Sequence, residues 1–113
     1  MRIQSGDYDN LFQEIKNDPE LFYRYTRMTL LNFQQLVQIT KPYLTKKSPR
    51  ALVPELRLLI TLRYLATGDL PFSIALAFRV GESTVREVVK EVCLVLIKVL
   101  QPLYDRNLKF SER

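Results

Sequence analysis

The chain has 113 residues, of which 47% are hydrophobic and 26% are charged. A chain of this length and composition is expected to form one globular domain with a substantial core. Its longest apolar run is far shorter than the ~20 residues that span a bilayer, so we expect no membrane association. It contains no histidine and a single cysteine, Cys93. Without histidine, the chain lacks the commonest general base and the commonest metal ligand, so we expect no cofactor and no metal. A single cysteine excludes an internal disulfide.

The net charge of +5 is unevenly distributed along the sequence. Residues 1–25 carry three basic and five acidic side chains, whereas residues 26–113 carry fourteen basic and seven acidic ones. A basic body suits a polyanion such as nucleic acid. The alternative is a soluble surface that is basic without a polyanionic partner.

Helix signals begin close to the N-terminus. Residues 1–7 are polar and are predicted to be flexible, and apolar residues at helical spacing predict a short helix over 8–16. Asp18 then stands before a Pro-Glu pair, a pattern that is typical of a helix start. We expect a single helical domain over residues 8–105 and a C-terminal tail over 106–113.

A third helix is predicted to begin after Thr29, which can cap it, and to end at Pro42. The stretch that follows contains Lys46, Lys47 and Arg50 and no acidic residue. Such a basic loop suits phosphate groups, which require charge without a fixed geometry. A solvated linker is the alternative interpretation of the same residues.

The most apolar helix is predicted between Pro54 and Gly68, residue types that open and close helices. Its apolar residues cover most of its circumference, which predicts a central helix packed on more than one side. They are Leu56, Leu58, Leu59, Ile60, Leu62, Leu65 and Ala66.

Residues 70–92 have the pattern of a helix, a short turn and a second helix. Small Ala75 allows two helices to approach closely, Gly81 is expected to relieve the backbone of the turn, and Ser83 or Thr84 can cap the second helix. One face of that helix is apolar through Val85, Val88, Val89 and Val92. A DNA-binding helix-turn-helix is built in this way. We therefore predict an all-α fold, a compact bundle of five to six helices that contains a helix-turn-helix.

Several motifs together resemble the N-terminal region of PIF/Harbinger-type DNA transposases and of the nucleases derived from them. The more specific ones are L-R-Y-L-A-T-G at Leu62–Gly68 and F-R-V-G-E-S-T-V at Phe78–Val85. Weaker ones are F-x-x-x-x-R-M-T at Phe22–Thr29, P-x-L at Pro42–Leu44 and P-x-x-R-L at Pro54–Leu58. The resemblance covers nearly the whole chain.

The resemblance implies a nuclear helix-turn-helix module that helps a transposase to find double-stranded DNA, and it implies a Myb-like partner protein. It also implies a catalytic RNase H-like domain with an Asp-Asp-Glu triad. Nothing in this sequence matches that domain, so we do not expect an enzyme, and we expect a fragment or a shortened, domesticated relative. One departure concerns the turn, where many such units have Gly and this chain has Arg79.

The first functional hypothesis is a DNA-binding module. Its expected DNA-binding residues are Arg79, Ser83, Thr84, Arg86, Glu87 and Lys90, together with Lys46, Lys47 and Arg50. Arg86 matches the two acceptors of guanine, and the other cations suit phosphates. Glu82, Glu87 and Glu91 lie on or near the same face and oppose this hypothesis. The alternative is that these charges only form ion pairs within the helix.

The second hypothesis is a protein-interaction or homodimerisation module. It rests on the apolar residues that continue the last helix, with Leu94, Ile97 and Leu100 as the expected partner interface. An enzymatic function is the weakest of the three, because no nucleophile has a base beside it and no phosphate-binding loop is present.

Overall fold

The computed structural model describes the backbone of residues 5–44 and 52–111 and the side chains of residues 11–44 and 52–102. These residues form six helices and no strand, so the predicted all-α fold is confirmed. The helices are α1 (Ser5–Lys16), α2 (Pro19–Thr26), α3 (Leu30–Leu44), α4 (Pro54–Thr67), α5 (Pro71–Phe78) and α6 (Glu82–Ser111). None of the helices in the described part is long and apolar enough to cross a membrane.

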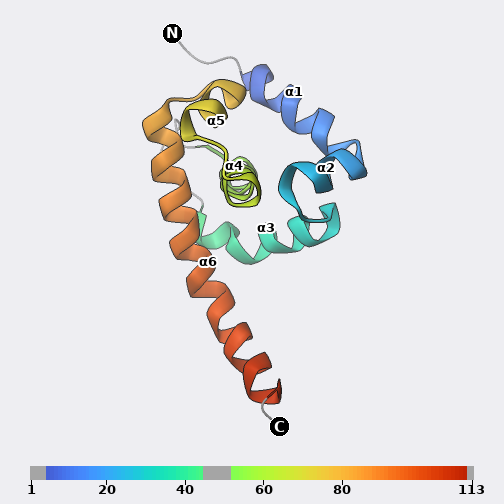
Figure 1. The fold of residues 1–113 in the computed structure, drawn as a ribbon, viewed down its shortest axis with the longest axis vertical. Helices are drawn as coiled ribbons and strands as arrows, with labels where there is room; N and C mark the ends of the chain where they lie inside the picture. Colours follow the sequence, from blue (N-terminus) through green and yellow to red (C-terminus); the bar gives the residue numbers. More distant parts are fainter. Residues whose placement is uncertain (1–4, 45–51, 112–113) are drawn as a thin grey trace.

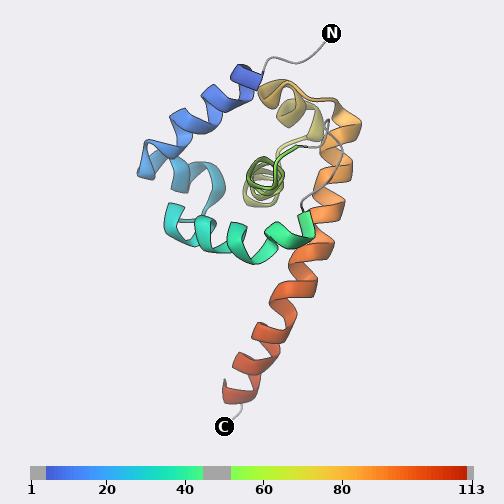
Figure 2. The same cartoon turned by 180° about the vertical axis from the view of Figure 1, so that it is seen from behind.

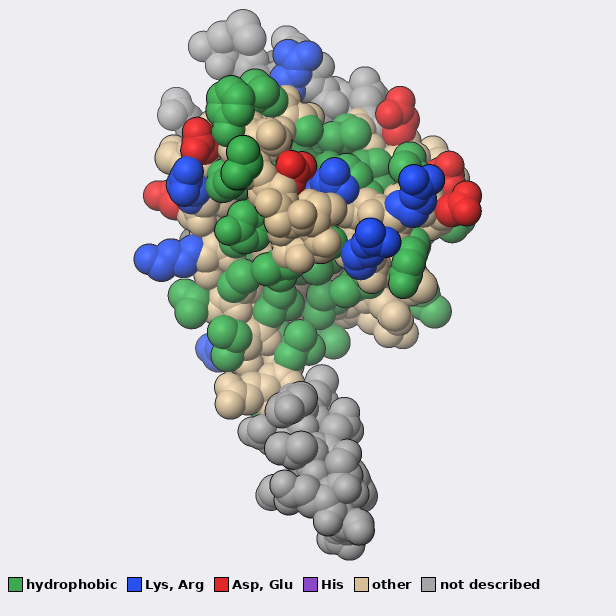
Figure 3. All heavy atoms as spheres, viewed as in Figure 1, with side chains coloured by type: hydrophobic (Ala, Val, Ile, Leu, Met, Phe, Trp, Pro, Cys, Tyr) green, Lys and Arg blue, Asp and Glu red, His purple; other side chains and the backbone are tan. Residues whose placement is uncertain are grey.

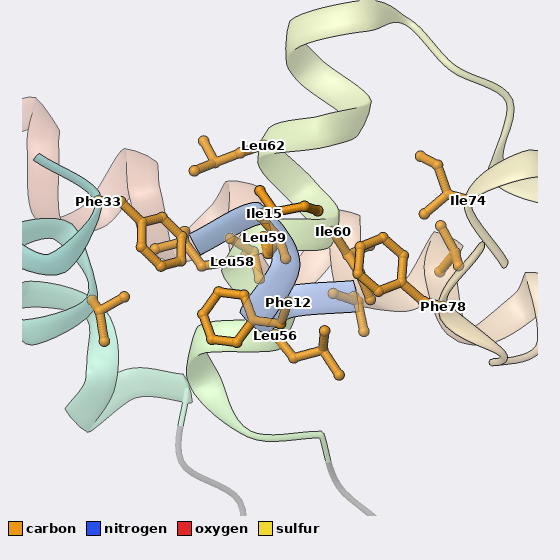
Figure 4. Packing of buried hydrophobic residues seen from close by; sticks show 14 of the residues in the cluster. Phe12, Ile15, Phe33, Leu56, Leu58, Leu59, Ile60, Leu62, Ile74 and Phe78 are labelled. Atoms are coloured by element: carbon orange, nitrogen blue, oxygen red, sulfur yellow. The ribbon is translucent and has the colours of Figure 1, made fainter. Parts of the chain in front are cut away.

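Helix α4 lies at the centre of the fold, and the other helices surround it (Figures 1 and 2). Its middle is buried on all sides, since Leu58, Leu59 and Ile60 have no exposed surface. Phe33 of α3 and Phe78 of α5 point into the same core (Figure 4). The predicted central helix is thus confirmed, with one exception: Leu65, near the end of α4, is 55% exposed.

The predicted caps hold the ends of three helices. The Asp18 carboxylate accepts a hydrogen bond from the amide of Leu21 (3.2 Å), and the Thr29 hydroxyl accepts one from the amide of Asn32 (3.2 Å). Gly68 ends α4 in the left-handed conformation, with φ of 69°. Side-chain oxygens satisfy amides that a helix N-terminus leaves free, and glycine accepts positive φ without strain. These local signals place the helices correctly.

Pro42 does not end its helix as predicted, and a second proline, Pro102, also lies within a helix. Helix α3 continues past Pro42 to Leu44, and α6 continues past Pro102 to Ser111. A proline lacks the N–H that would bond to the carbonyl four residues earlier. Those carbonyls belong to Gln38 and Lys98, which are both exposed, so water can hydrogen-bond to the carbonyl groups.

The two ends of the chain also differ from the prediction. Helix α1 already begins at Ser5, within the stretch 1–7 that was predicted to be flexible, and α6 includes most of the expected tail 106–113. The glycine at position 6 lowers helix propensity by only about 1 kcal/mol relative to alanine, which does not prevent a helix. At the other end of the chain, α6 extends well beyond the rest of the bundle (Figure 1).

An ion pair between helices α4 and α6 was not predicted. Arg57 is only 7% exposed, and its guanidinium pairs with the carboxylate of Glu91. Burial lowers the pKa of the Arg57 guanidinium. Its Nε atom is buried and has no hydrogen-bond partner in the described part of the chain. Glu91 therefore supplies the countercharge that keeps a buried cation in the core.

Candidate nucleic-acid interface

Helices α5 and α6 pack against each other across a turn of three residues, 79–81. Ile74, Ala75 and Phe78 of α5 are buried, as are Val85 and Val88 of α6. Both helices therefore present one apolar face to the core and leave another face outside, as the apolar spacing predicts. Because the buried face fixes the orientation of α6, the outer side chains of its first turns are held in place.

The residue that reverses the chain in the turn is Arg79, and the expectation for Gly81 was wrong. Arg79 has φ of 59°, and the amide of Val80 donates to the carbonyl of Ala75 (3.1 Å). Gly81 does not adopt a positive φ. The reversal occurs directly after Phe78, at the end of α5, where helices commonly end in the left-handed conformation. The arginine thus adopts the left-handed conformation that glycine usually provides at the end of a helix.

The start of α6 also differs from the expected cap. The amide of Val85 donates to the carbonyl of Gly81 (3.1 Å), so α6 begins directly after Gly81. Ser83 and Thr84 consequently lie within the first turn of the helix and not at the capping position before it. Ser83 is exposed and Thr84 is half-buried. The Ser83 hydroxyl is therefore open to an external partner.

Replacing Arg79 with glycine is expected to raise the free energy of unfolding by about 0.5–1 kcal/mol. A side chain in the left-handed conformation costs about 1–2 kcal/mol, which glycine avoids. Part of this gain is offset because glycine loses more conformational entropy on folding than other residues. Urea denaturation followed by circular dichroism measures the change. The matched control is Arg86→Gly, within α6, which should lower stability by about 1 kcal/mol. Equal losses in both variants would contradict the role of Arg79 in the turn.

The outer face of α6 carries polar side chains along its first turns. Arg86 is 63% exposed, and Ser83, Glu87 and Lys90 are also exposed. These residues recur every three or four positions, so they form one stripe on the side of the helix away from Val85. The structure thus brings together Ser83, Arg86, Glu87 and Lys90, which were predicted to contact DNA, whereas the fifth predicted residue of α6, Thr84, is half-buried and lies off this stripe.

Positive and negative side chains both lie on the first turns of α6. The Arg86 guanidinium pairs with the Glu82 carboxylate across one helical turn (Nη2–Oε2 2.6 Å). Such exposed pairs contribute only about 0.3–0.5 kcal/mol, so the arginine can leave its partner at little cost. Glu91 was expected to oppose DNA on this face, but its carboxylate pairs with buried Arg57. Arg86 and Lys90 then face Glu82 and Glu87 on the first turns of α6, and Arg79 is exposed in the turn before the helix.

The remaining predicted residues form two groups. Lys46, Lys47 and Arg50 lie outside the described residues. Leu94 and Ile97 lie further along α6 and are 62% and 58% exposed, and Leu100 is 37% exposed. Sequence reasoning missed that further apolar side chains on α5 and in the segment before it are exposed, because the apolar pattern alone does not tell which side of a strongly apolar helix is covered. They are Leu65, Leu70, Phe72 and Leu76.

A separate groove lies between α3 and the beginning of α4. Its lining includes the side chains of Gln34, Gln38, Lys41, Pro54 and Glu55. In the described part of the chain, no cluster of three or more His, Cys, Asp or Glu residues is arranged to hold a metal ion. Comparisons of the chain with models of protein families, with curated proteins and with solved structures found no match.

Proposed function

We propose that this chain is a DNA-binding module in which α5 and α6 act as a helix-turn-helix, and that it acts in the nucleus. The first turns of α6 would enter the major groove of double-stranded DNA. The observation that supports this proposal is the exposed polar stripe of Ser83, Arg86 and Lys90 on a helix whose opposite face is fixed in the core. A recognition helix requires this combination, because only a fixed helix presents its side chains in a defined register.

The resemblance to Harbinger-type transposases supports the same proposal. Its two more specific motifs, Leu62–Gly68 and Phe78–Val85, contain the end of α4 and the whole turn between α5 and α6. We infer that the chain is a DNA-binding module of a transposase of this type or of a protein derived from one.

Within this proposal, Arg86 reads bases and the other cations bind phosphates. The planar guanidinium of Arg86 can donate two hydrogen bonds to O6 and N7 of guanine once it leaves Glu82. Lys90 lies one turn further along the same face, and Arg79 lies in the turn before α6. Both cations could bind the phosphates at the edges of a groove, and such contacts do not depend on the base sequence.

Substitutions of Arg86 and Lys90 are expected to have different effects on binding. Arg86→Ala should lower the preference for a duplex selected from a random pool, by about 1–3 kcal/mol relative to a random duplex. Lys90→Ala should weaken binding to both duplexes equally. It should also reduce the slope of log affinity against log salt concentration by the amount that corresponds to about one phosphate contact. Glu82→Gln should strengthen binding, since it removes a negative charge and releases Arg86. Fluorescence anisotropy of labelled duplexes measures each change.

The matched control is Lys98→Ala, which removes the same charge from the same helix two turns further along. We expect DNA affinity close to that of the parent, because Lys98 lies over the ring of Tyr43, 4.9 Å from its centre. Equal losses on both duplexes for Arg86→Ala would contradict base reading. Equal losses for Lys90→Ala and Lys98→Ala would contradict a defined DNA face.

A protein-interaction function is the second candidate, and the exposure of Leu94 and Ile97 favours it. Exposed apolar groups of this kind often mark protein interfaces. A Myb-like protein is the partner that the family resemblance suggests, and another copy of the chain is the alternative. The two functions are compatible, because the polar residues and the apolar residues lie in different segments of α6.

A further inference from the structure

The outer stripe of α6 becomes apolar beyond the candidate DNA face. Leu94 and Ile97 follow Lys90 at intervals of four and three residues, so these three side chains lie on one side of the helix. Both apolar residues are more than half exposed. A DNA backbone has no complement for them, so this part of the helix suits a different partner.

Tyr43 of α3 extends this apolar surface beyond α6. Helices α3 and α6 pack against each other. Lys98 lies one turn beyond Leu94, and its ammonium lies over the ring of Tyr43, 4.9 Å from the ring centre. Tyr43 is itself 47% exposed. We call Tyr43, Leu94 and Ile97 the distal face.

The charges beside the distal face are positive. Lys90 and Lys98 flank Leu94, one turn before it and one turn after it. The sequence has no acidic residue between 30 and 44 or between 92 and 102. Neither lysine forms an ion pair with another described residue. Where α3 and α6 meet, hydrophobic side chains dominate the surface in Figure 3 and no acidic side chain is visible. The distal face therefore complements apolar side chains that are flanked by carboxylates.

We propose that the distal face binds an amphipathic helix of another protein, whose apolar stripe covers the face and whose acidic residues pair with Lys90 and Lys98. The face offers its partner side chains only, because the backbone groups of α6 are hydrogen-bonded within the helix. An extended segment would bury unpaired amide and carbonyl groups there, whereas a helix satisfies its own. A second copy of the chain would bring lysines opposite lysines, so like charges disfavour that occupant.

The position of Lys98 favours recognition of a carboxylate. Its ammonium is already held over the ring of Tyr43, so less side-chain freedom is lost when an acidic residue pairs with it. This proposal rests on the protein-interaction function and specifies the chemistry of its partner. It does not depend on DNA binding, because Tyr43, Leu94, Ile97 and Lys98 are not among the residues proposed to contact DNA.

Selection of peptides on the full chain tests the chemistry of the partner. The probe is a phage-displayed library of helical peptides of about 15 residues, randomised on one face. We expect the selected peptides to carry apolar residues three or four positions apart, with Asp or Glu one turn outside them. Replacing those acidic residues with lysine in a synthetic peptide should weaken binding at least about tenfold. Selected peptides without acidic residues, or no selection above background, would overturn the proposal.

Substitutions in the chain test where the selected peptide binds. Fluorescence anisotropy of the labelled peptide should show binding about tenfold weaker for Leu94→Ala, which removes an apolar anchor. Lys98→Ala should weaken binding about 2- to 5-fold, as expected for an exposed ion pair. The matched control is Leu31→Ala, which changes a leucine of α3 that is 65% exposed and should leave the affinity unchanged. Equal affinities for Leu94→Ala and the parent would overturn the proposal.

Two further measurements test the other possible occupants. A dimer in sedimentation equilibrium that Leu94→Glu dissociates would assign the distal face to a second copy and overturn the proposal. Leu94→Ala and Lys98→Ala should bind duplex DNA like the parent, and a loss in both variants would assign the face to DNA instead. A loss of DNA binding confined to Arg86→Ala and Lys90→Ala leaves this proposal intact, so its failure and the failure of the DNA proposal are distinguishable.

Discussion

Replacing Leu59 with alanine is expected to lower the free energy of unfolding by about 4 kcal/mol. Leu59 has no exposed surface and lies in the middle of α4, which is surrounded by the other helices (Figure 4). Truncation removes apolar contacts and leaves a cavity that several helices would have to move to fill, so the loss should be near the upper end of the usual range. Urea denaturation followed by circular dichroism measures it.

Leu65→Ala is the matched control for this prediction, because it makes the same change in the same helix. Leu65 is 55% exposed, so we expect a loss of less than about 1 kcal/mol. The difference between the two variants isolates burial from helix propensity, which both substitutions alter equally. Unfolding curves of Leu59→Ala that superimpose on those of the parent would remove α4 from the centre of the core.

Replacing Glu91 with alanine is expected to destabilise the protein by about 3 kcal/mol. The substitution leaves the buried guanidinium of Arg57 without its carboxylate, and an uncompensated buried charge is strongly destabilising. The same denaturation experiment measures the loss. Glu87→Ala, one turn earlier on the exposed face of α6, should change stability by less than about 0.5 kcal/mol.

A double substitution distinguishes the charge effect from lost packing. Arg57→Met combined with Glu91→Met should recover much of the stability that Glu91→Ala loses, because a buried ion pair can be replaced by apolar side chains of similar volume. If the double variant is less stable than Glu91→Ala, the ion pair contributes more than charge compensation.

Local signals in the sequence predicted most of the fold. Asp18, Thr29 and Gly68 act within a few residues of their own position, and their hydrogen bonds or backbone angles match the prediction. The central position of α4 followed from apolar residues on most sides of one helix. The interactions behind these patterns involve only residues close in sequence, so they could be predicted without knowing where the rest of the chain lies.

Features that depend on distant residues could not be predicted. Arg57 and Glu91 are 34 positions apart, and nothing near either residue indicates that they meet. Leu65 looks as apolar as Leu59, but its exposure depends on where neighbouring helices end. Pro42 and Pro102 have ordinary helix-ending chemistry, and only the position of the affected carbonyls at the surface explains why both helices continue.

The candidate DNA face was predicted only in part. The spacing of Val85, Val88 and Val92 predicted the buried side of α6 and so the outward position of Arg86 and Lys90. The sequence did not indicate that Arg79 forms the turn or that Glu91 pairs with Arg57. Both details matter for the proposed function, because Arg79 lies directly before the proposed recognition helix and the Arg57–Glu91 pair removes a negative charge from the face of that helix.

The most direct test of DNA binding is the fluorescence anisotropy of a labelled random duplex titrated with this chain at several salt concentrations. The proposal predicts binding at low salt whose affinity falls steeply as salt increases, with a slope of about −0.9 for each phosphate neutralised. Absence of binding at ~10⁻⁴ M protein and low salt, where even non-specific DNA-binding proteins associate, would contradict it.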